Sequence, residues 1–258
     1  MALNIVDLIE SIPLSYGLDF RVDRYNVTES ATVQIMAVDN NVSTTESIVD
    51  YEHITYYFGT TAETMDISSS NNSDTMQVTV YYYSSTSDTE PSTQSVTLSG
   101  QTPVTLSSDI FRISKMIISS SASSLNAGTV YLYKNGTSVT NGVPSSNIVA
   151  LMAPNIGCSR QSYMYVPAGW NAYLISVNLV NNAVSGNEIR VKEYHMVSPS
   201  SSFLYQVNDI TLNNSSYHYD ENLAPAIPEN STYVVKSSKS NVLTTATLTV
   251  LYHFVLLR

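Results

Sequence analysis

The sequence predicts an all-β fold, an antiparallel β-sandwich of jelly-roll type. Two observations lead to this prediction. Apolar and polar side chains alternate along most of the chain, as in antiparallel strands with one buried face. Clusters of Ser, Asn, Thr, Gly and Pro separate these stretches, and after residue 16 no helix-period segment stands between them. The 258 residues suffice for one continuous sandwich or for two packed sandwich subdomains.

Residues 1–16 have a different pattern. The stretch "NIVDLIESI" places Ile5, Leu8, Ile9 and Ile12 on one face of a short helix. A helix of this length is marginal by itself and must dock onto something. It either covers the core of its own domain or anchors the chain to a neighbour. We predict an anchoring segment, with Ile5, Leu8 and Ile9 as its contact residues.

Strands are expected wherever the alternation continues. The ranges are 19–27, 31–38, 51–58, 75–83, 94–100, 103–107, 110–119, 128–136, 146–152, 161–180, 187–197, 231–237 and 244–258. In the last range Ala246, Leu248, Val250, Tyr252, Phe254 and Leu256 share one face. A terminal stretch this apolar must be tied into a sheet, so we expect a central or well-covered strand.

The connections are predicted from their turn residues. In "YMYVPAGWNAYLISVNLV" the residues Pro167, Ala168 and Gly169 predict the corner of a β-hairpin, because Pro fixes φ and Gly accepts positive φ. Polar loops are expected at 68–74 and 84–92. The stretch 137–146 is the best candidate for a boundary, which gives subdomains 17–143 and 144–258.

The charge balance excludes a nucleic-acid partner. The chain has 11 Lys and Arg against 21 Asp and Glu, a net charge of −10, and only 12% of its residues are charged. Binding to phosphates requires clustered cations, whereas here the basic residues are scattered. A surface made polar mainly by Ser, Thr, Asn and Tyr suits a protein that sits among identical neighbours, although secreted lectins and fibres look similar.

The chain also lacks signals for secretion or membrane insertion. "MALNIVDLIESI" carries Asp7 and Glu10 and no basic start, and no run approaches the roughly 18 apolar residues of a spanning helix. We expect a soluble protein made in the host cytoplasm, without a membrane partner. The single cysteine, Cys158, cannot form an internal disulfide, and we interpret it as a small core or loop residue.

No motif indicates catalysis. The histidines His53, His195, His218 and His253 have no partner at metal-ligand spacing. The cluster "YHYDEN" at 217–222 is interpreted as a polar loop, since it lacks the pattern of a calcium loop. Nucleophile elbows and phosphate loops are absent. A glycan hydrolase would need two convergent carboxylates, which a sequence cannot locate. We predict no catalytic residue, no cofactor, no metal and no enzyme activity.

Tyrosine is the unusual residue of this chain, with 19 Tyr against 5 Phe and 1 Trp. Tyrosine is enriched at interfaces, where it offers a large area with a polar tip, and it is also a good strand former. Both interpretations stay open. As partner contacts at strand edges we predict Tyr82, Tyr83, Tyr131, Tyr133 and Trp170.

Three segments carry a resemblance to a known family. They are "SVTLSGQTPVTLSSDIFRISKMIISSSASSLNAGTVYLYKNG", "IGCSRQSYMYVPAGWNAYLISVNL" and "TATLTVLYHFVLLR". Their order resembles that of virion structural proteins from tailed bacteriophages, notably phages of aquatic hosts, over roughly the last two-thirds of the chain. Before residue 76 the chain departs from this pattern. The resemblance implies a β-sandwich, a place on the virion surface such as capsid decoration, and no catalytic residue.

These observations together predict a non-enzymatic virion protein that decorates or cements the outer surface of a tailed-phage head. The expected partners are the major capsid protein or other virion proteins, with homo-oligomerisation as a dimer or trimer because virion proteins occupy symmetry axes. The alternative is a tail fibre, a receptor-binding module or a head–tail neck component. Trp170 beside Asn171 is an aromatic residue next to an amide, a pair that a glycan-binding module would use. Fold class alone does not separate these roles.

Overall fold

The computed structural model describes residues 30–39, 41–119, 125–181, 188–197, 204–213, 216–220, 226–240 and 246–258. The prediction of an all-β protein is confirmed, because these residues form antiparallel sheets and none of them is helical. The predicted anchoring segment 1–16, with Ile5, Leu8 and Ile9, and the predicted strand at 19–27 lie outside the described residues.

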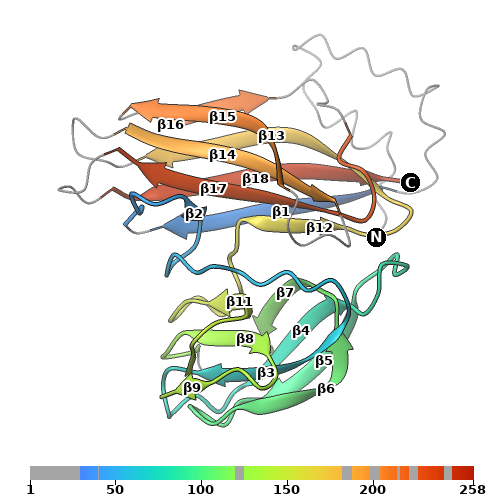
Figure 1. Cartoon of the computed structure of the whole chain (residues 1–258), viewed down its shortest axis with the longest axis vertical. Coiled ribbons are helices and arrows are strands. Elements are labelled where there is room, and N and C mark those ends of the chain that lie inside the picture. The colour runs from blue at the N-terminus through green and yellow to red at the C-terminus, as the bar shows by residue number, and fades with distance from the viewer. Residues whose placement is uncertain are drawn as a thin grey trace.

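Figure 1 shows two β-sandwich lobes, one above the other. We call the upper one the terminal lobe. Its β18 sheet has the order β1-β18-β13-β16, and its β17 sheet the order β12-β17-β14-β15, with β2 also paired to β17. The strands are β1 (Ser30–Asp39), β2 (Ser47–Ile48), β12 (Tyr163–Val166), β13 (Asn171–Asn181), β14 (Glu188–Val197), β15 (Leu204–Asn213), β16 (Ser216–Asp220), β17 (Ser231–Lys239) and β18 (Leu248–Leu257).

The lower, inserted lobe holds all the strands that lie between β2 and β12 in the chain. Its β8 sheet has the order β11-β8-β3-β6, and its β4 sheet the order β5-β4-β7. The strands are β3 (Glu63–Ser69), β4 (Gln77–Tyr83), β5 (Ser92–Thr97), β6 (Val104–Ile110), β7 (Arg112–Ile118), β8 (Val130–Lys134), β9 (Val139–Thr140), β10 (Val143–Pro144) and β11 (Ile148–Met152).

The lobes are nested, which differs from the predicted division at 143/144. Strand β1 pairs with β18 along its whole length, from Ser30 opposite Leu257 to Asp39 opposite Leu248. Strand β11, beyond the predicted boundary, pairs with β8 of the inserted lobe. The stretch 137–146 is itself a tight β9–β10 hairpin, whose turn residues Asn141 and Gly142 both have positive φ. The turn residues at 137–146 therefore indicate a hairpin and not a boundary. Pairing between strands distant in sequence decides which strands belong to each lobe.

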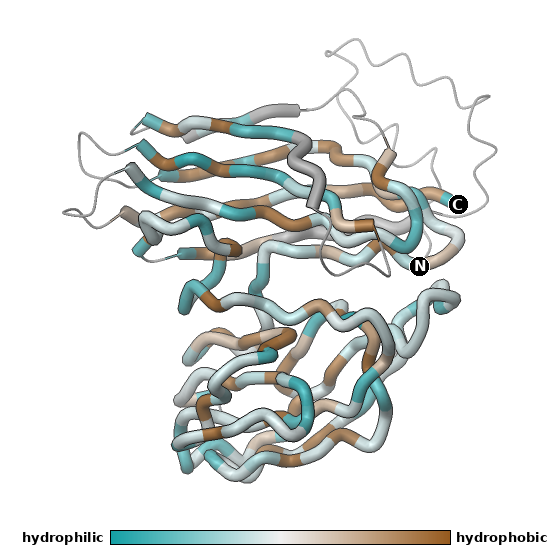
Figure 2. The backbone as a smooth tube through the Cα atoms, viewed as in Figure 1, coloured by the Kyte–Doolittle hydropathy of each residue, from teal (hydrophilic) through white to brown (hydrophobic). Residues whose placement is uncertain are grey.

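The core of the terminal lobe lies between its two sheets, as the alternation predicted. All six residues of the predicted apolar face of β18 are buried and belong to this core, namely Ala246, Leu248, Val250, Tyr252, Phe254 and Leu256. Strand β18 lies between β1 and β13, so the prediction of a central strand is confirmed. Figure 2 shows hydrophobic positions alternating with hydrophilic ones along several strands.

Three local predictions are wrong, the first being the polar loop at 217–222, because residues 216–220 form strand β16 paired with β13. The corner at Pro167–Gly169 turns the chain as expected, with Gly169 at φ 76°. However, β12 pairs with β17 and β13 pairs with β18, so the corner crosses between sheets and makes no hairpin. Residues 51–58 form only an isolated bridge, Tyr56 to Ile148. The Asp50 carboxylate accepts the backbone N–H groups of Glu52 and Ile54, and these bonds turn the chain away from a strand.

Candidate functional site between the two lobes

The junction between the lobes is built by strands that are buried on both faces. In β8, Val130 and Leu132 point into the core of the inserted lobe, whereas Tyr131 and Tyr133 point the other way. In β17, Tyr233 and Val235 lie in the terminal core and Val234 in the junction. The junction cluster comprises Ile48, Tyr56, Tyr131, Tyr133, Ile148, Leu151, Tyr163, Tyr194 and Val234. Each lobe therefore covers an apolar face of the other.

A second, aromatic contact lies beside this cluster. The ring of Tyr165 from the terminal lobe packs edge-on against the rings of Tyr83 and Phe111, with distances between ring centres of 5.0 Å and 5.8 Å. The buried Arg112 guanidinium lies 4.1 Å from the Phe111 ring centre and donates to the carbonyl of Gly59. Burial lowers the pKa of Arg112 to about 10, so it stays a cation at neutral pH. Ring geometry of this kind favours one relative orientation of the packed faces.

Trp170 marks a third contact between the lobes. Its indole Nε1 donates to the carbonyl of Thr89, in the loop after β4, at 2.9 Å. The backbone N–H of Ala168 donates to the carbonyl of Asp88 in the same loop. On the other side, the Arg258 guanidinium lies 4.8 Å from the Trp170 ring centre. The loop predicted at 84–92 is therefore held against the terminal lobe.

The structure places the predicted contact residues inside the chain. Tyr82, Tyr83, Tyr131, Tyr133 and Trp170 are all at most 7% exposed. They are consequently not available on the surface of this chain as edge contacts for a partner. Tyr82 belongs to the core of the inserted lobe, and the other four lie where the lobes meet. The tyrosines do mark an interface, but it is an internal one.

The first linker between the lobes carries a polar cluster, in which Asp39 and Asp50 are buried. His53 Nε2 lies 2.7 Å from Asp39 Oδ1, at the end of β1. Glu52 accepts from the hydroxyls of Thr129 and Tyr131 in the inserted lobe. Asp50 is fully buried, and this burial raises its pKa to about 7. Linker residues 50–53 therefore hold contacts to both lobes.

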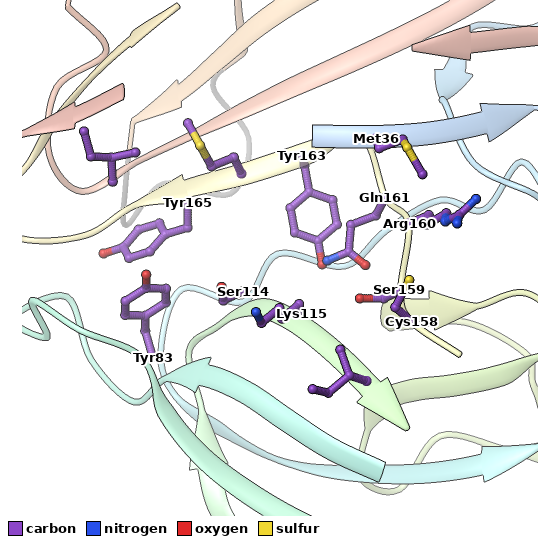
Figure 3. Close-up of a pocket in the computed structure, with 13 residues that line it drawn as sticks. Met36, Tyr83, Ser114, Lys115, Cys158, Ser159, Arg160, Gln161, Tyr163 and Tyr165 are labelled. Atoms are coloured by element: carbon purple, nitrogen blue, oxygen red, sulfur yellow. The ribbon is translucent and has the colours of Figure 1, made fainter. Parts of the chain in front are cut away.

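A cavity of about 440 Å³ opens beside the second linker, residues 153–162. Figure 3 shows Tyr165, Tyr163 and Met36 on the side of the terminal lobe and Tyr83, Ser114 and Lys115 on the side of the inserted lobe. Among the residues that the structure describes, its lining includes the two cations Arg160 and Lys115 and no carboxylate. Ser114 and Lys115 are exposed, so the cavity reaches the surface.

Two lining residues have unmatched polar groups. Gln161 is 6% exposed, and neither its Nε2 nor its Oε1 has a hydrogen-bond partner among the described residues. The Nε of the half-buried Arg160 is likewise buried without a partner there. In Figure 3 the Gln161 side chain points from the linker towards the inserted lobe, whereas the Arg160 side chain extends to the other side of the linker, below Met36. Buried amide and guanidinium groups without partners are costly, so water or a ligand in the cavity is expected to satisfy them.

Sequence reasoning did not select Arg160 or Gln161. The run "CSRQS" looks like an ordinary polar approach to the strand that follows. Cys158, also in that run, is a free half-buried thiol on the cavity wall. Only the packing of β7, β12 and β1 around the linker turns this run into the wall of a cavity.

The described residues offer little other candidate chemistry. They contain no group of three or more His, Cys, Asp or Glu placed to hold a metal ion. His218 is exposed on β16, and Glu221 of the "YHYDEN" cluster lies outside the described residues. No described helix has the length and apolar character to cross a membrane. The buried carboxylate Glu193 accepts from the Tyr252 hydroxyl inside the terminal core, away from the cavity lining.

Comparison with known proteins identifies no family for this chain. No protein-family model matches the chain, and no curated protein matches its sequence at a significant level. A structure of the Gt strain of infectious bursal disease virus matches with 8% identity and a TM-score of 0.21, covering 90% of this chain and 73% of the other. A structure of the Gx strain matches with 10% identity and a TM-score of 0.18, covering 89% and 74%. Scores this low support no conclusion about function.

Proposed function

We propose that this chain is a non-enzymatic virion structural protein that decorates the outer surface of a tailed-phage head. The observation that carries the proposal is the nested pair of sandwiches with a packed junction. Two linkers and an aromatic junction hold the inserted lobe in one orientation on the terminal lobe. Such a rigid two-lobed body can attach through one lobe and present the other.

The resemblance to phage virion proteins covers elements of both lobes. Its first segment forms β5 to β8 of the inserted lobe, and the others form β12, β13 and β18 of the terminal lobe. The pattern therefore includes the strands of the junction itself, Tyr131 and Tyr163 among them. The acidic, weakly charged composition suits the outside of a shell better than its DNA-facing side.

The proposed orientation follows from the predicted anchor. Residues 1–16 precede β1, which is an edge strand of the terminal lobe. If they bind the shell, the terminal lobe lies next to it and the inserted lobe points outwards. The partners in this arrangement are the major capsid protein and further copies of this chain.

The test is gold labelling of intact particles by electron microscopy. An epitope tag at the Asn135–Gly136 turn would be exposed, because a Cβ at Gly136 would meet nothing within 4 Å. We expect label spread over the head, and weaker labelling of the same tag placed after Arg258 in the terminal lobe. Label at one vertex or on fibres would favour the neck or receptor-binding alternative. Particles without label, both intact and opened, would contradict a virion protein.

A further inference from the structure

The cavity between the lobes has the composition of an anion-binding site. In a chain of net charge −10, the described residues that line it include Arg160 and Lys115 and no Asp or Glu. Arg160 is half-buried, and no ion pair to a carboxylate is found for it among the described residues. A guanidinium in this position favours a planar carboxylate, which it can bind through two parallel N–H groups.

Gln161 narrows the chemistry of the ligand. Its Nε2 needs an acceptor and its Oε1 a donor, and both atoms are buried at the cavity without a partner among the described residues. A simple carboxylate would satisfy only the donor. Adjacent hydroxyl groups both donate and accept, so a hydroxylated ligand satisfies the whole amide.

The walls suit the body of such a ligand. Met36 and Leu256 come from the terminal lobe and Ile117 from the inserted lobe. Met36 is 37% exposed although it is large and apolar. A volume of about 440 Å³ is in the range of small-molecule sites, which are mostly apolar with a few placed polar groups.

We propose that this cavity binds a sugar acid, a compound with one carboxylate beside vicinal hydroxyl groups. The carboxylate lies at Arg160, the hydroxyls bond Gln161, and the ring packs on Met36 and Leu256. The proposal goes beyond the virion role and does not depend on it. The same chemistry is offered by a free uronic acid and by the end of an acidic polysaccharide.

Titration calorimetry of the full chain with D-glucuronate and D-galacturonate tests this site. Glucose, galactose and acetate are the matched probes that lack the carboxylate or the hydroxyls. We expect at least one uronate to bind about ten-fold or more tightly than all three. Digalacturonate distinguishes the sources, because tighter binding than the monomer indicates the end of a glycan and weaker binding a free sugar acid.

Variants locate the binding. Arg160→Gln should weaken uronate binding about ten-fold or more, since it removes a charge-assisted hydrogen bond. Ser114→Asp places a carboxylate in the cavity from an exposed position, so it should repel the ligand without affecting folding. Arg190→Gln is the control, because the exposed Arg190 pairs with the exposed Asp209 and does not line the cavity.

Any of three results would overturn the proposal. Uronates that bind no better than the neutral sugars would remove the role of the cations. Affinity that survives in both Arg160→Gln and Ser114→Asp, with circular dichroism unchanged, would place the binding elsewhere. A crystal structure in saturating uronate that shows only water on Gln161 would have the same meaning.

Discussion

The cores of the two lobes and the junction between them are built from different residues. The inserted core is almost entirely aliphatic, with Ile67, Val80, Leu106 and Leu132 among its fully buried residues. The junction is instead rich in tyrosine, and several hydroxyls there have defined partners. Aliphatic packing stabilises without direction, whereas a hydroxyl with a partner also fixes orientation. The aliphatic core thus stabilises the inserted lobe, and the junction sets how the lobes sit together.

The largest expected effect comes from damaging a core. Phe254 is fully buried in the terminal lobe and packs edge-on against Tyr233. Phe254→Ala should lower the free energy of unfolding by about 3–5 kcal/mol, because it removes a large buried ring and leaves a cavity. Urea denaturation followed by the fluorescence of Trp170, the single tryptophan, measures this loss. A loss below about 1 kcal/mol would mean that the core is not packed as described.

A smaller effect should come from the buried linker carboxylate, and it should depend on pH. The pKa of Asp50 is about 7 in the folded chain against an ordinary 3.8, because burial disfavours its charge. The folded state therefore binds the proton more tightly. The contribution of Asp50 to stability is fully present below about pH 4 and is lost as the pH rises through 7.

Asp50→Asn removes this titration and keeps an acceptor for the N–H groups of Glu52 and Ile54. The free energy of unfolding of the variant minus that of the natural chain should increase by about 2–4 kcal/mol from pH 5 to pH 8. Urea midpoints at the two pH values measure the difference. An equal difference at both values would show that Asp50 does not titrate in this range.

The smallest effect should come from a single junction hydroxyl. The Tyr163 hydroxyl donates to the buried carbonyl of Val149 in the inserted lobe. Tyr163→Phe should cost about 1–2 kcal/mol, because it leaves that carbonyl without this donor. Tyr83→Phe is the matched control, since no hydrogen bond of the Tyr83 hydroxyl is found among the described residues. Equal losses in the two variants would show that the junction is stabilised by ring packing alone.

The sequence predicted the strands well where a single face is buried. The alternation of β18 gave both its buried residues and its central place, because period-two burial follows from strand geometry alone. The strands β3, β15 and β16 were not predicted. In β3 the sequence "ETMDISS" carries Asp66 and Ser68 at buried positions, and hydrogen bonds from Asn135 and to Gly142 satisfy them. Such partners are distant in sequence and cannot be read from local pattern.

By itself the sequence determined an all-β chain with a net negative charge, a small share of charged residues and many tyrosines, because these properties depend on composition and local periodicity. Only the tertiary structure decided that one sandwich is inserted into the other, since β1 finds its partner β18 more than 200 residues away. The same pairing turned Tyr83, Tyr131, Tyr133 and Trp170 inwards and brought Arg160 and Gln161 to a cavity wall. Which surface a side chain faces depends on which strands meet, and that is a property of the whole chain.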